Sequence, residues 1–449
     1  MQLIIVGGVA AGAKAAARAR RVDPALAITL YQEESEVSYT GCGQPYYLSG
    51  LIARRESLVI RQAADFQAEG IAVRLRHRVT ALDLAQRIVT ARNLETGETE
   101  TAAFDRLILA TGARSVIPKL PGVDLDGVVS LRTMAELDRF KECLDRLHPQ
   151  NAVIVGGGYI GLEVAESMRS LGLEVTLVER CGRLFPRLDP ELGQRVHDCL
   201  TVHGVQLVLD DGLSRVVGEA GRAAVVETES GLSLPADLVV LAIGIRPNVE
   251  LAAQAGIALG TTGAIAVDER METHVPGVFA AGDCAESRHR LTGRPVWGPL
   301  GDIANLQGRV AGENAAGGDA HFPGILGTAI FKTFELNVGI TGLTEATARE
   351  AGFEPVAALI SARDKARYYP GGRELSLKLV ADAASGRLLG AQAIGPGAVD
   401  KMIDIAATAL LGKLDCRELE YADLAYAPPF SQVLSPIIVA AGALAKKIR

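Results

Sequence analysis

The sequence lacks the features that would place it among membrane, nucleic-acid-binding or disulfide-rich proteins. No window holds the roughly 18 uninterrupted apolar residues that a membrane-spanning helix needs. Only six cysteines occur among 449 residues, and none forms a Cys-x-x-Cys pair. We therefore expect neither a disulfide framework nor a metal site, and a reducing, cytoplasmic location. The formal net charge of -7 argues against a broad basic surface for nucleic acid.

What the sequence does contain is a strand–helix–strand pattern that occurs twice. The first unit begins on an apolar run with no basic segment before it, which favours a buried strand over a signal peptide. Its strand, helix and strand span residues 3–6, 10–22 and 27–31. Those of the second unit span residues 152–155, 162–171 and 174–178. Two such units predict an α/β protein with two parallel, Rossmann-like dinucleotide-binding folds.

Further patterns predict where one fold is inserted into the other. Strands at 107–112 and 238–244 each end in glycine, and another ends in the run 279–283. After residue 323 the pattern becomes α+β. Its predicted strands are 328–338, 375–381 and 388–393, and its predicted helices are 400–411 and 416–424. We therefore expect a discontinuous first domain (1–112 and 245–322), an inserted domain (113–244) and a C-terminal domain (323–449).

A glycine motif follows the first strand of the second unit. It reads Gly156-x-Gly158-x-x-Gly161 and opens the predicted helix. The first glycine makes a tight turn, the second lets the backbone approach a pyrophosphate, and the third packs the helix on the strand. The N–H groups of the helix N-terminus then face the phosphates. The motif predicts a dinucleotide site, and a glycine turn without a ligand is the alternative.

The residue that ends the next strand bears on the choice of nucleotide. Glu179 can accept hydrogen bonds from both ribose hydroxyls and would repel a 2′-phosphate, which favours NADH. Arg180 and Arg183 stand close to it in the sequence. Because arginine can bind a 2′-phosphate, NADPH stays an alternative.

The glycine motif of the first unit is less regular. It reads Gly7-Gly8-Val9-Ala10-Ala11-Gly12, and its ribose position holds Gln32, with Glu33 beside it. An amide can bind a ribose hydroxyl, although without the charge-assisted strength of a carboxylate. Asp283 offers a second acceptor to a ribose-like chain, unless it only caps a helix. We predict a second dinucleotide site here.

One cysteine stands in a distinctive setting. Cys42 lies between Gly41 and Gly43, just before a helix that we expect at 43–48 with Pro45 in its first turn. A thiol at a helix N-terminus has a lowered pKa and is more often ionised. The alternative is a buried cysteine that acts as a small apolar residue. The position favours a redox-active thiol.

Together these motifs resemble the single-cysteine branch of the flavoprotein (pyridine nucleotide) disulfide reductases. That branch includes coenzyme A–disulfide reductase, NADH-dependent persulfide reductase, NADH oxidase and NADH peroxidase. Tyr47 stands where a two-cysteine member has its second redox cysteine. The segments that carry the resemblance are 7–12, the Cys42 segment, 156–161, Gly282-Asp283 and Tyr426–Pro429. It implies two nested Rossmann-like domains, as in glutathione reductase, and a C-terminal domain that forms a homodimer.

The resemblance also implies the cofactors and their ligands. FAD belongs in the first fold and NADH, or NADPH, in the second, with Tyr159 as a gate over the flavin and Glu163 near the nicotinamide. The implied FAD-binding residues are Gly7, Gly8, Ala11, Gly12, Gln32, Glu33, Val79, Ala110, Thr111, Gly112, Arg132, Gly282 and Asp283. The implied NAD-binding residues are Gly156, Gly158, Tyr159, Ile160, Gly161, Glu163, Glu179 and Gly244.

Residues that differ among members of the branch indicate the substrate. The oxidases and peroxidases carry a histidine in the first glycine turn, where this sequence has none. Arg20-Arg21 instead match the coenzyme A–disulfide and persulfide reductases. Lys14, Arg18 and Arg21 fall on one helix face, which could hold the phosphates of coenzyme A or be a solvated charged face. The expected substrate-binding residues are Lys14, Arg18, Arg21, Ser38 and Tyr39.

Two tyrosines complete the expected site. Tyr368 and Tyr426 resemble residues that reach the partner subunit's thiol, where a hydroxyl could bond to sulfur, and core packing is the alternative. The sequence departs from the branch at Gly41, Gln44 and Phe430, and at Asp302 near the flavin. All four lie on the expected substrate side and bear on coenzyme A specificity.

We predict an FAD-dependent NAD(P)H reductase of a disulfide, persulfide or polysulfide, with Cys42, Tyr368 and Tyr426 as catalytic residues. Coenzyme A is a candidate ligand. The alternatives are an NADH oxidase and a flavoprotein redox sensor or scaffold. Because the sequence ends at Arg449, we expect no C-terminal rhodanese-like extension.

Overall fold

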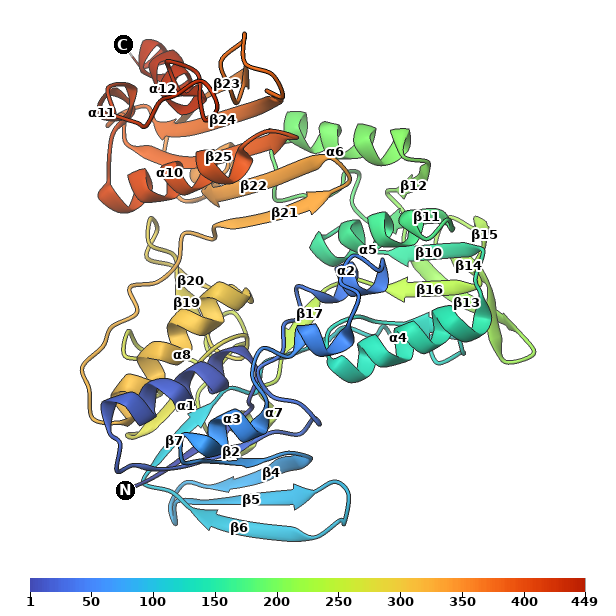
Figure 1. The fold of residues 1–449 in the computed structure, drawn as a ribbon, viewed down its shortest axis with the longest axis vertical. Coiled ribbons are helices and arrows are strands. Elements are labelled where there is room, and N and C mark those ends of the chain that lie inside the picture. Colours follow the sequence, from blue (N-terminus) through green and yellow to red (C-terminus); the bar gives the residue numbers. More distant parts are fainter. Residues whose placement is uncertain (449) are drawn as a thin grey trace. The chain divides into compact units, whose positions relative to one another are not determined.

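The computed structural model describes residues 1–448 (Figure 1). Its internal contacts divide the chain into two compact units. The first comprises Met1–Ile117, Val129–Arg146 and Gly244–Ile325, and the second comprises Pro118–Val128, Leu147–Ile243 and the chain from Leu326 onward. The second nucleotide fold and the C-terminal segment thus share a unit, and the division into three domains stays a prediction.

The first unit is built on a five-stranded parallel sheet in the order β18-β7-β1-β2-β3. These strands are β1 (Gln2–Val6), β2 (Ala27–Tyr31), β3 (Ile71–Arg74), β7 (Arg106–Leu109) and β18 (Val278–Ala280). Leu3, Ile4 and Ile5 have no exposed surface, because both faces of the sheet are covered, as a parallel sheet requires. Helix α1 (Ala10–Val22) spans the residues that the sequence predicted.

Helix α8 (Gly301–Ala315) packs closely against α1 at two of its glycines. A Cβ atom added at Gly308 would lie 2.2 Å from the carbonyl oxygen of Ala11, and one added at Gly312 would lie 2.3 Å from that of Ala15. The two backbones are therefore as close as glycine and alanine allow. This contact fixes α1, whose first turn belongs to the Gly7–Gly12 loop.

We expect Gly308→Val to destabilise the first unit by about 1–3 kcal/mol, because the side chain would force α1 and α8 apart. Gly301→Ala is the matched control, since a Cβ there meets nothing within 4 Å and alanine favours a helix. The midpoint of thermal unfolding, followed by the fluorescence of released flavin, measures both variants. Equal midpoints for Gly308→Val and the wild type would refute the contact as a determinant of stability.

The remaining elements of the first unit surround this sheet. Three antiparallel strands, β4 (His77–Asp83), β5 (Ile88–Asn93) and β6 (Thr99–Ala103), form a separate sheet. Two short antiparallel pairs join β8 (Ala113–Ser115) with β17 (Ile245–Pro247), and β19 (Ser287–Arg288) with β20 (Pro295–Val296). The other helices are α2 (Gln44–Leu48), α3 (Ala63–Ala68), α4 (Met134–Leu147), α7 (Glu250–Gln254) and the 3₁₀ turn η1 (Arg55–Leu58).

The second unit repeats the nucleotide fold. Its sheet has the order β12-β11-β10-β16-β9, from β9 (Val128–Val129), β10 (Asn151–Val155), β11 (Glu174–Glu179), β12 (Val205–Leu209) and β16 (Leu238–Leu241). Helices α5 (Tyr159–Ser170) and α6 (Pro190–Val202) pack on β10–β12, and β13 (Leu213–Glu219), β14 (Arg222–Thr228) and β15 (Ser233–Pro235) form an antiparallel sheet. The two β-α-β predictions are confirmed.

The C-terminal part of the second unit is an antiparallel sheet in the order β21-β22-β25-β24-β23. Its strands are β21 (Ala329–Thr333), β22 (Leu336–Gly342), β23 (Pro355–Arg363), β24 (Glu374–Asp382) and β25 (Leu388–Gly395). Helix α10 (Val399–Gly412) packs on β22 and β25, and α12 (Pro436–Lys447) packs on β23 and β24. The short helices are α9 (Glu345–Glu350) and α11 (Cys416–Glu420).

Two predictions in this region were wrong. The single strand expected at 328–338 is a hairpin, β21 and β22, because Phe334 turns the chain with a φ of 49°. No glycine or asparagine marks that turn. The helix expected at 416–424 ends at Glu420. Strand β23 and helix α12 were not predicted.

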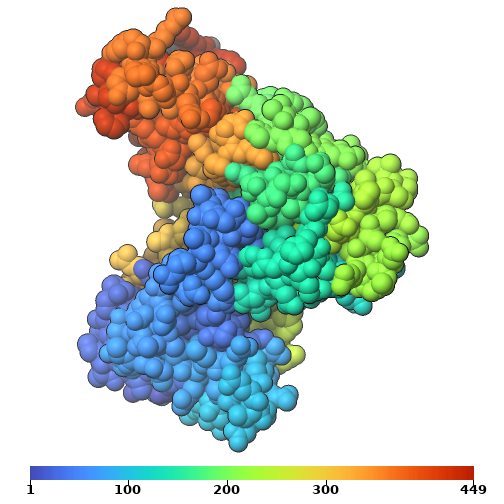
Figure 2. All heavy atoms as spheres, turned by 45° about the vertical axis from the view of Figure 1, so that its right-hand side comes forward, coloured from blue at the N-terminus to red at the C-terminus, as the bar shows by residue number. Residues whose placement is uncertain are grey.

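A buried lysine joins the nucleotide fold to the C-terminal sheet within this unit. Lys378 of β24 lies 2.8 Å from Asp189 and 2.6 Å from Glu345, and it also pairs with Glu191. Its side chain is only 4% exposed. Asp189 precedes α6 but caps none of its N–H groups. It accepts a 2.6 Å hydrogen bond from Gln392 of β25 instead. In Figures 1 and 2, α6 (light green) abuts the C-terminal sheet (orange).

Within residues 1–448, no helix combines the length and apolar character that crossing a bilayer requires. No disulfide joins the six cysteines, all of which lie in this range.

Candidate functional site

The first glycine loop lies at the carboxyl end of β1, where the strand order reverses between β7 and β2. Ligands of parallel sheets bind at such a switch point. Gly7 has a φ of 99°, and a Cβ added there would lie 2.1 Å from the oxygen of Ala110. A Cβ added at Gly12 would lie 1.8 Å from the oxygen of Gly7. Only glycine fits both positions, which leaves the loop's backbone open to a pyrophosphate.

Gln32, at the predicted ribose position, supports this loop directly. Its side-chain oxygen accepts a 2.7 Å hydrogen bond from the N–H of Gly8, and the residue is 4% exposed. Its side-chain nitrogen lies 3.5 Å from the Glu34 carboxylate. This nitrogen is the group that would donate a hydrogen bond to a ribose hydroxyl. Glu33 points to the surface, where it pairs with Arg78.

The other predicted FAD ligands gather at the same edge of the sheet. Ala110, Thr111 and Gly112 directly follow β7, and Gly282 and Asp283 follow β18. Arg132 forms an ion pair with Asp283. No helix begins directly after Asp283, because strand β19 follows it, so the alternative of a helix N-cap is wrong. Val79 lies buried in β4, and Ala11 is buried on α1. The set fits a dinucleotide laid across the carboxyl ends of β1, β7 and β18.

The second glycine loop repeats this geometry at the switch point between β16 and β11. A Cβ added at Gly156 would lie 2.3 Å from the oxygen of Ala242, and one at Gly161 would lie 1.9 Å from the oxygen of Gly156. No atom lies within 4 Å of a Cβ placed at Gly158, which is the position that a pyrophosphate approaches. Gly244, after β16, has a φ of 107°.

Glu179 occupies in this fold the place that Gln32 has in the first. One carboxylate oxygen accepts a 2.6 Å hydrogen bond from the N–H of Gly157, and the other accepts a 2.8 Å bond from the N–H of Cys181. Both nearby arginines have other partners. Arg180 lies 2.5 Å from Glu229, and Arg183 donates to the oxygen of Pro186.

The predicted gate residue, Tyr159, is the first residue of α5 and has contacts on two sides. The hydroxyl of Tyr159 accepts a 2.6 Å hydrogen bond from Arg187. Its ring packs edge-on against Phe185 and Phe331, with centroids 4.7 Å and 5.3 Å away. Burial raises the pKa of Tyr159. Ile160 and Glu163 lie on the same helix, both partly exposed.

Cys42 is exposed, and α2 begins two residues after it with Pro45 in its first turn, so the predicted helix is confirmed. Gly43 is required, because a Cβ there would lie 2.6 Å from the side chain of Leu58. The buried amide of Gln44 donates to the oxygen of Arg132. The thiol's segment is thereby tied to a predicted FAD ligand.

The predicted substrate residues have mixed surroundings. Arg18 pairs with Glu313 of α8 at 2.5 Å, so its charge is satisfied within the unit. Lys14 is partly exposed, and Arg21 is exposed. Tyr39 is buried and donates to Glu34 at 2.8 Å. Burial and that carboxylate raise the pKa of Tyr39. Ser38 donates its N–H to the oxygen of Gly8, and these substrate roles stay predictions.

The two tyrosines assigned to the thiol lie together on the C-terminal part of the chain. Their hydroxyls share a hydrogen bond, which raises the pKa of Tyr426. Tyr368 is 76% exposed and Tyr426 is 44% exposed, so neither packs in the core of this chain. The C-terminal part of the chain also exposes other large apolar side chains, namely Leu411, Tyr421, Phe430, Val433, Leu434 and Val439.

Sequence reasoning missed the residues that position these groups. Arg187, Glu313 and Gln307 belong to this set, the last because its side-chain oxygen accepts from the N–H of Gly282 at 2.8 Å. Each partner lies 25 or more residues away along the chain. No local pattern signals such pairs.

Comparison with known proteins identifies the family. Residues 1–297 match the pyridine nucleotide-disulphide oxidoreductase family, and residues 328–436 match its dimerisation domain. The chain belongs to the pyridine nucleotide-disulphide oxidoreductase family. Its cofactors are therefore FAD and NAD(P)H, and the recognition of the family and the predicted fold class are confirmed.

Two sequence relatives and two solved structures are similar to this chain over nearly all of its length. The chain is 39% identical over 444 residues to an NAD(P)H coenzyme A polysulfide/persulfide reductase of Pyrococcus horikoshii, covering 99% of this chain and 98% of that one. It is 34% identical to an NADH oxidase of Methanocaldococcus jannaschii over 100% and 99% of the two chains. Reduced CoADR-RHD from Bacillus anthracis superposes with a TM-score of 0.97 at 35% identity, over all of this chain and 80% of that one. An NAD-dependent persulfide reductase from A. fulgidus gives 0.96 at 38%, over 100% and 83%.

Proposed function

We propose that this oxidoreductase uses NADH to reduce a disulfide or persulfide of coenzyme A, or a polysulfide, through Cys42. The observation that carries the proposal is the exposed thiol of Cys42. It is followed by Gly43 and the buried amide of Gln44, and Tyr47 stands in place of a second redox cysteine. The names of the relatives support sulfur compounds as substrates.

The thiolate of Cys42 acts as the nucleophile. It attacks one sulfur of the substrate RS–SR, forms a mixed disulfide with Cys42 and releases RS⁻. One NADH then supplies a hydride, which is one proton with two electrons. Reduction of the mixed disulfide returns Cys42 as the thiolate and releases RSH and NAD⁺. FAD, when bound, carries those two electrons from the nicotinamide to the disulfide. Tyr368 and Tyr426 supply hydroxyl donors that would stabilise the departing sulfur of a partner subunit's site.

NADH is the favoured reductant. The Glu179 carboxylate is fixed at the glycine loop by two backbone N–H groups, where it would accept from ribose hydroxyls and repel a 2′-phosphate. Arg180 and Arg183, the residues that could neutralise that phosphate, have other partners.

The dimerisation domain and the reactive thiolate support a quaternary structure and a location for the protein. The chain carries the family's dimerisation domain, and the exposed apolar side chains of its C-terminal part are the surface that a second copy would cover. A homodimer is therefore the proposed active form. The cytoplasm is the proposed location, because a thiolate that must be regenerated at each turnover suits a reducing compartment.

The test is anaerobic NADH consumption by the FAD-loaded protein with coenzyme A disulfide, and separately with polysulfide. We expect turnover with at least one of them that exceeds NADH-dependent oxygen uptake by tenfold or more. Turnover with polysulfide alone would assign Gly41 and Gln44 to a changed substrate pocket. Oxygen uptake faster than either reaction would refute the proposal and favour an NADH oxidase.

A further inference from the structure

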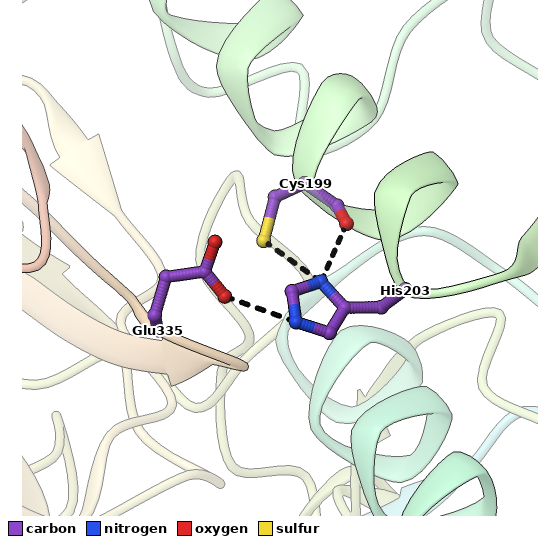
Figure 3. Close-up of side chains that lie close together, drawn as sticks. All are labelled: Cys199, His203 and Glu335. Atoms are coloured by element: carbon purple, nitrogen blue, oxygen red, sulfur yellow. Dashed lines mark hydrogen bonds and ion pairs between the residues drawn. The ribbon is translucent and has the colours of Figure 1, made fainter.

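Three side chains outside the proposed active site converge in the second unit. Figure 3 shows Cys199 and His203, one turn apart on and just after α6, facing Glu335 of the turn between β21 and β22. One donor atom from each residue lies within 4.8 Å of the others. Thiolate, imidazole and carboxylate are together the donor set that zinc takes in proteins. The cluster is separate from the glycine loops and from Cys42.

The imidazole is oriented by the backbone. Nδ1 of His203 lies 2.9 Å from the carbonyl oxygen of Cys199 and 3.8 Å from its sulfur, so Nδ1 carries a proton. The ring also stacks on Phe334, with centroids 4.0 Å apart and planes at 15°. Metal-binding histidines are held in this way, with one nitrogen bonded to a carbonyl and the other left to coordinate.

The remaining nitrogen faces a carboxylate. Nε2 of His203 lies 3.2 Å from a carboxylate oxygen of Glu335. A shared proton holds such a pair together, and so does a metal ion bound to both atoms.

The thiol supplies the third donor atom. Cys199 is buried on α6, where its sulfur lies 3.8 Å from Nδ1 of His203 and 3.9 Å from the oxygen of Thr333. Sulfur is a soft ligand that suits zinc, and binding of the cation would displace the thiol proton.

We propose that Cys199 Sγ, His203 Nε2 and a Glu335 oxygen bind one zinc ion, with water as the fourth ligand. Zinc bond lengths at tetrahedral angles place such ligand atoms about 3.3–3.6 Å apart. The 3.2 Å between Nε2 and the Glu335 oxygen is about 0.1 Å below this range, and the three donor atoms lie within 4.8 Å of one another. Glu335 is 47% exposed and lies in a turn, so its side chain can move the small distance that closes the site. Binding releases the thiol proton, and any proton on Nε2, to water.

The turn that carries Glu335 is fixed from a second side. Glu166 of α5 accepts a 2.8 Å hydrogen bond from the N–H of Phe334 and pairs with Lys332 at 2.5 Å. Zinc would therefore join α6 to a hairpin that α5 already holds. The ion's place is structural, and its test needs no substrate.

The experiment measures zinc bound by the FAD-containing protein after chelator treatment, re-addition of zinc and gel filtration. The background variant is Cys42→Ser with Cys181→Ser, which removes the two exposed thiols as adventitious ligands. We expect one zinc per chain in this background. Cys199→Ala and His203→Ala should each reduce it at least tenfold, and Glu335→Gln should weaken it. A retained flavin content shows that each variant is folded.

The matched control is His197→Ala, a histidine on the same helix whose partners are Gln194 and Asp198. Zinc binding unchanged by His197→Ala, together with cobalt d–d absorption that is lost in Cys199→Ala, supports the site. No zinc in the background variant, or equal zinc in Cys199→Ala, overturns it, and a proton alone then joins His203 to Glu335.

Discussion

Cys42→Ser should lower turnover with a disulfide or persulfide by about 10³-fold or more, because a serine hydroxyl neither ionises at neutral pH nor forms a mixed disulfide. The change is isosteric and exposed, so the fold should not respond. Gly43, Gln44 and the contact to Arg132 stay in place. The measurement is kcat for anaerobic NADH consumption.

The control for this variant lies within the same protein. Anaerobic bleaching of the bound flavin by NADH needs both nucleotide loops but no thiol, so we expect its rate in Cys42→Ser to stay within about twofold of wild type. Loss of both rates would indicate a damaged cofactor site. Disulfide turnover retained at the wild-type rate would exclude Cys42 as the nucleophile.

Lys378→Met should cost about 3–5 kcal/mol of stability, the range for removing one partner of a buried ion pair. The lysine is 4% exposed and is the cation for Asp189, Glu191 and Glu345. Without it, the buried Asp189 retains only Gln392 as a donor from the C-terminal sheet. We expect a lower midpoint of chemical denaturation, measured by circular dichroism on FAD-saturated protein.

The matched control is Lys332→Met, in strand β21 at the edge of the same sheet. Lys332 also pairs with a glutamate of the nucleotide fold, Glu166, but it is 47% exposed. Exposed ion pairs contribute about 0–1 kcal/mol. Similar losses for the two variants would mean that burial does not set the strength of the Lys378 cluster.

The pH dependence of this loss has a definite sign. The three carboxylates raise the pKa of Lys378, so wild type keeps the full contribution at any pH below the ordinary lysine value of about 10.4. The contribution is lost only as the pH rises through the raised folded-state pKa of the lysine. The difference in stability between wild type and Lys378→Met should therefore be unchanged around neutral pH and shrink at a pH above about 10.4.

Much of the nucleotide folds could be predicted because their signals are local. The helix at 10–22 and the strand at 27–31 were placed to the residue, since an apolar run, a glycine turn and Pro24 mark every boundary. The hairpin at Phe334 could not be found, because its turn conformation is imposed by tertiary contacts of Glu166 and His203 rather than by a turn residue.

In the candidate site, too, residues marked by local patterns could be predicted, whereas partners that are distant in the chain could not. Glycine spacing identified both loops, and Cβ contacts explain why the first and last glycine of each loop are required. The basic face of α1 was predicted from helical spacing alone. That reasoning could not include Glu313, which reaches Arg18 from α8 and satisfies its charge.

The contact between α1 and α8 has a consequence for biosynthesis. The first sheet gains its edge strand β18, and α1 its covering helix α8, only from residues 278–315. The second nucleotide sheet is complete by residue 241. On the ribosome, domains fold as units when their residues have emerged. We therefore expect the second nucleotide fold to form first. The N-terminal strands and α1 would complete their packing only after residues 278–315 have been synthesised.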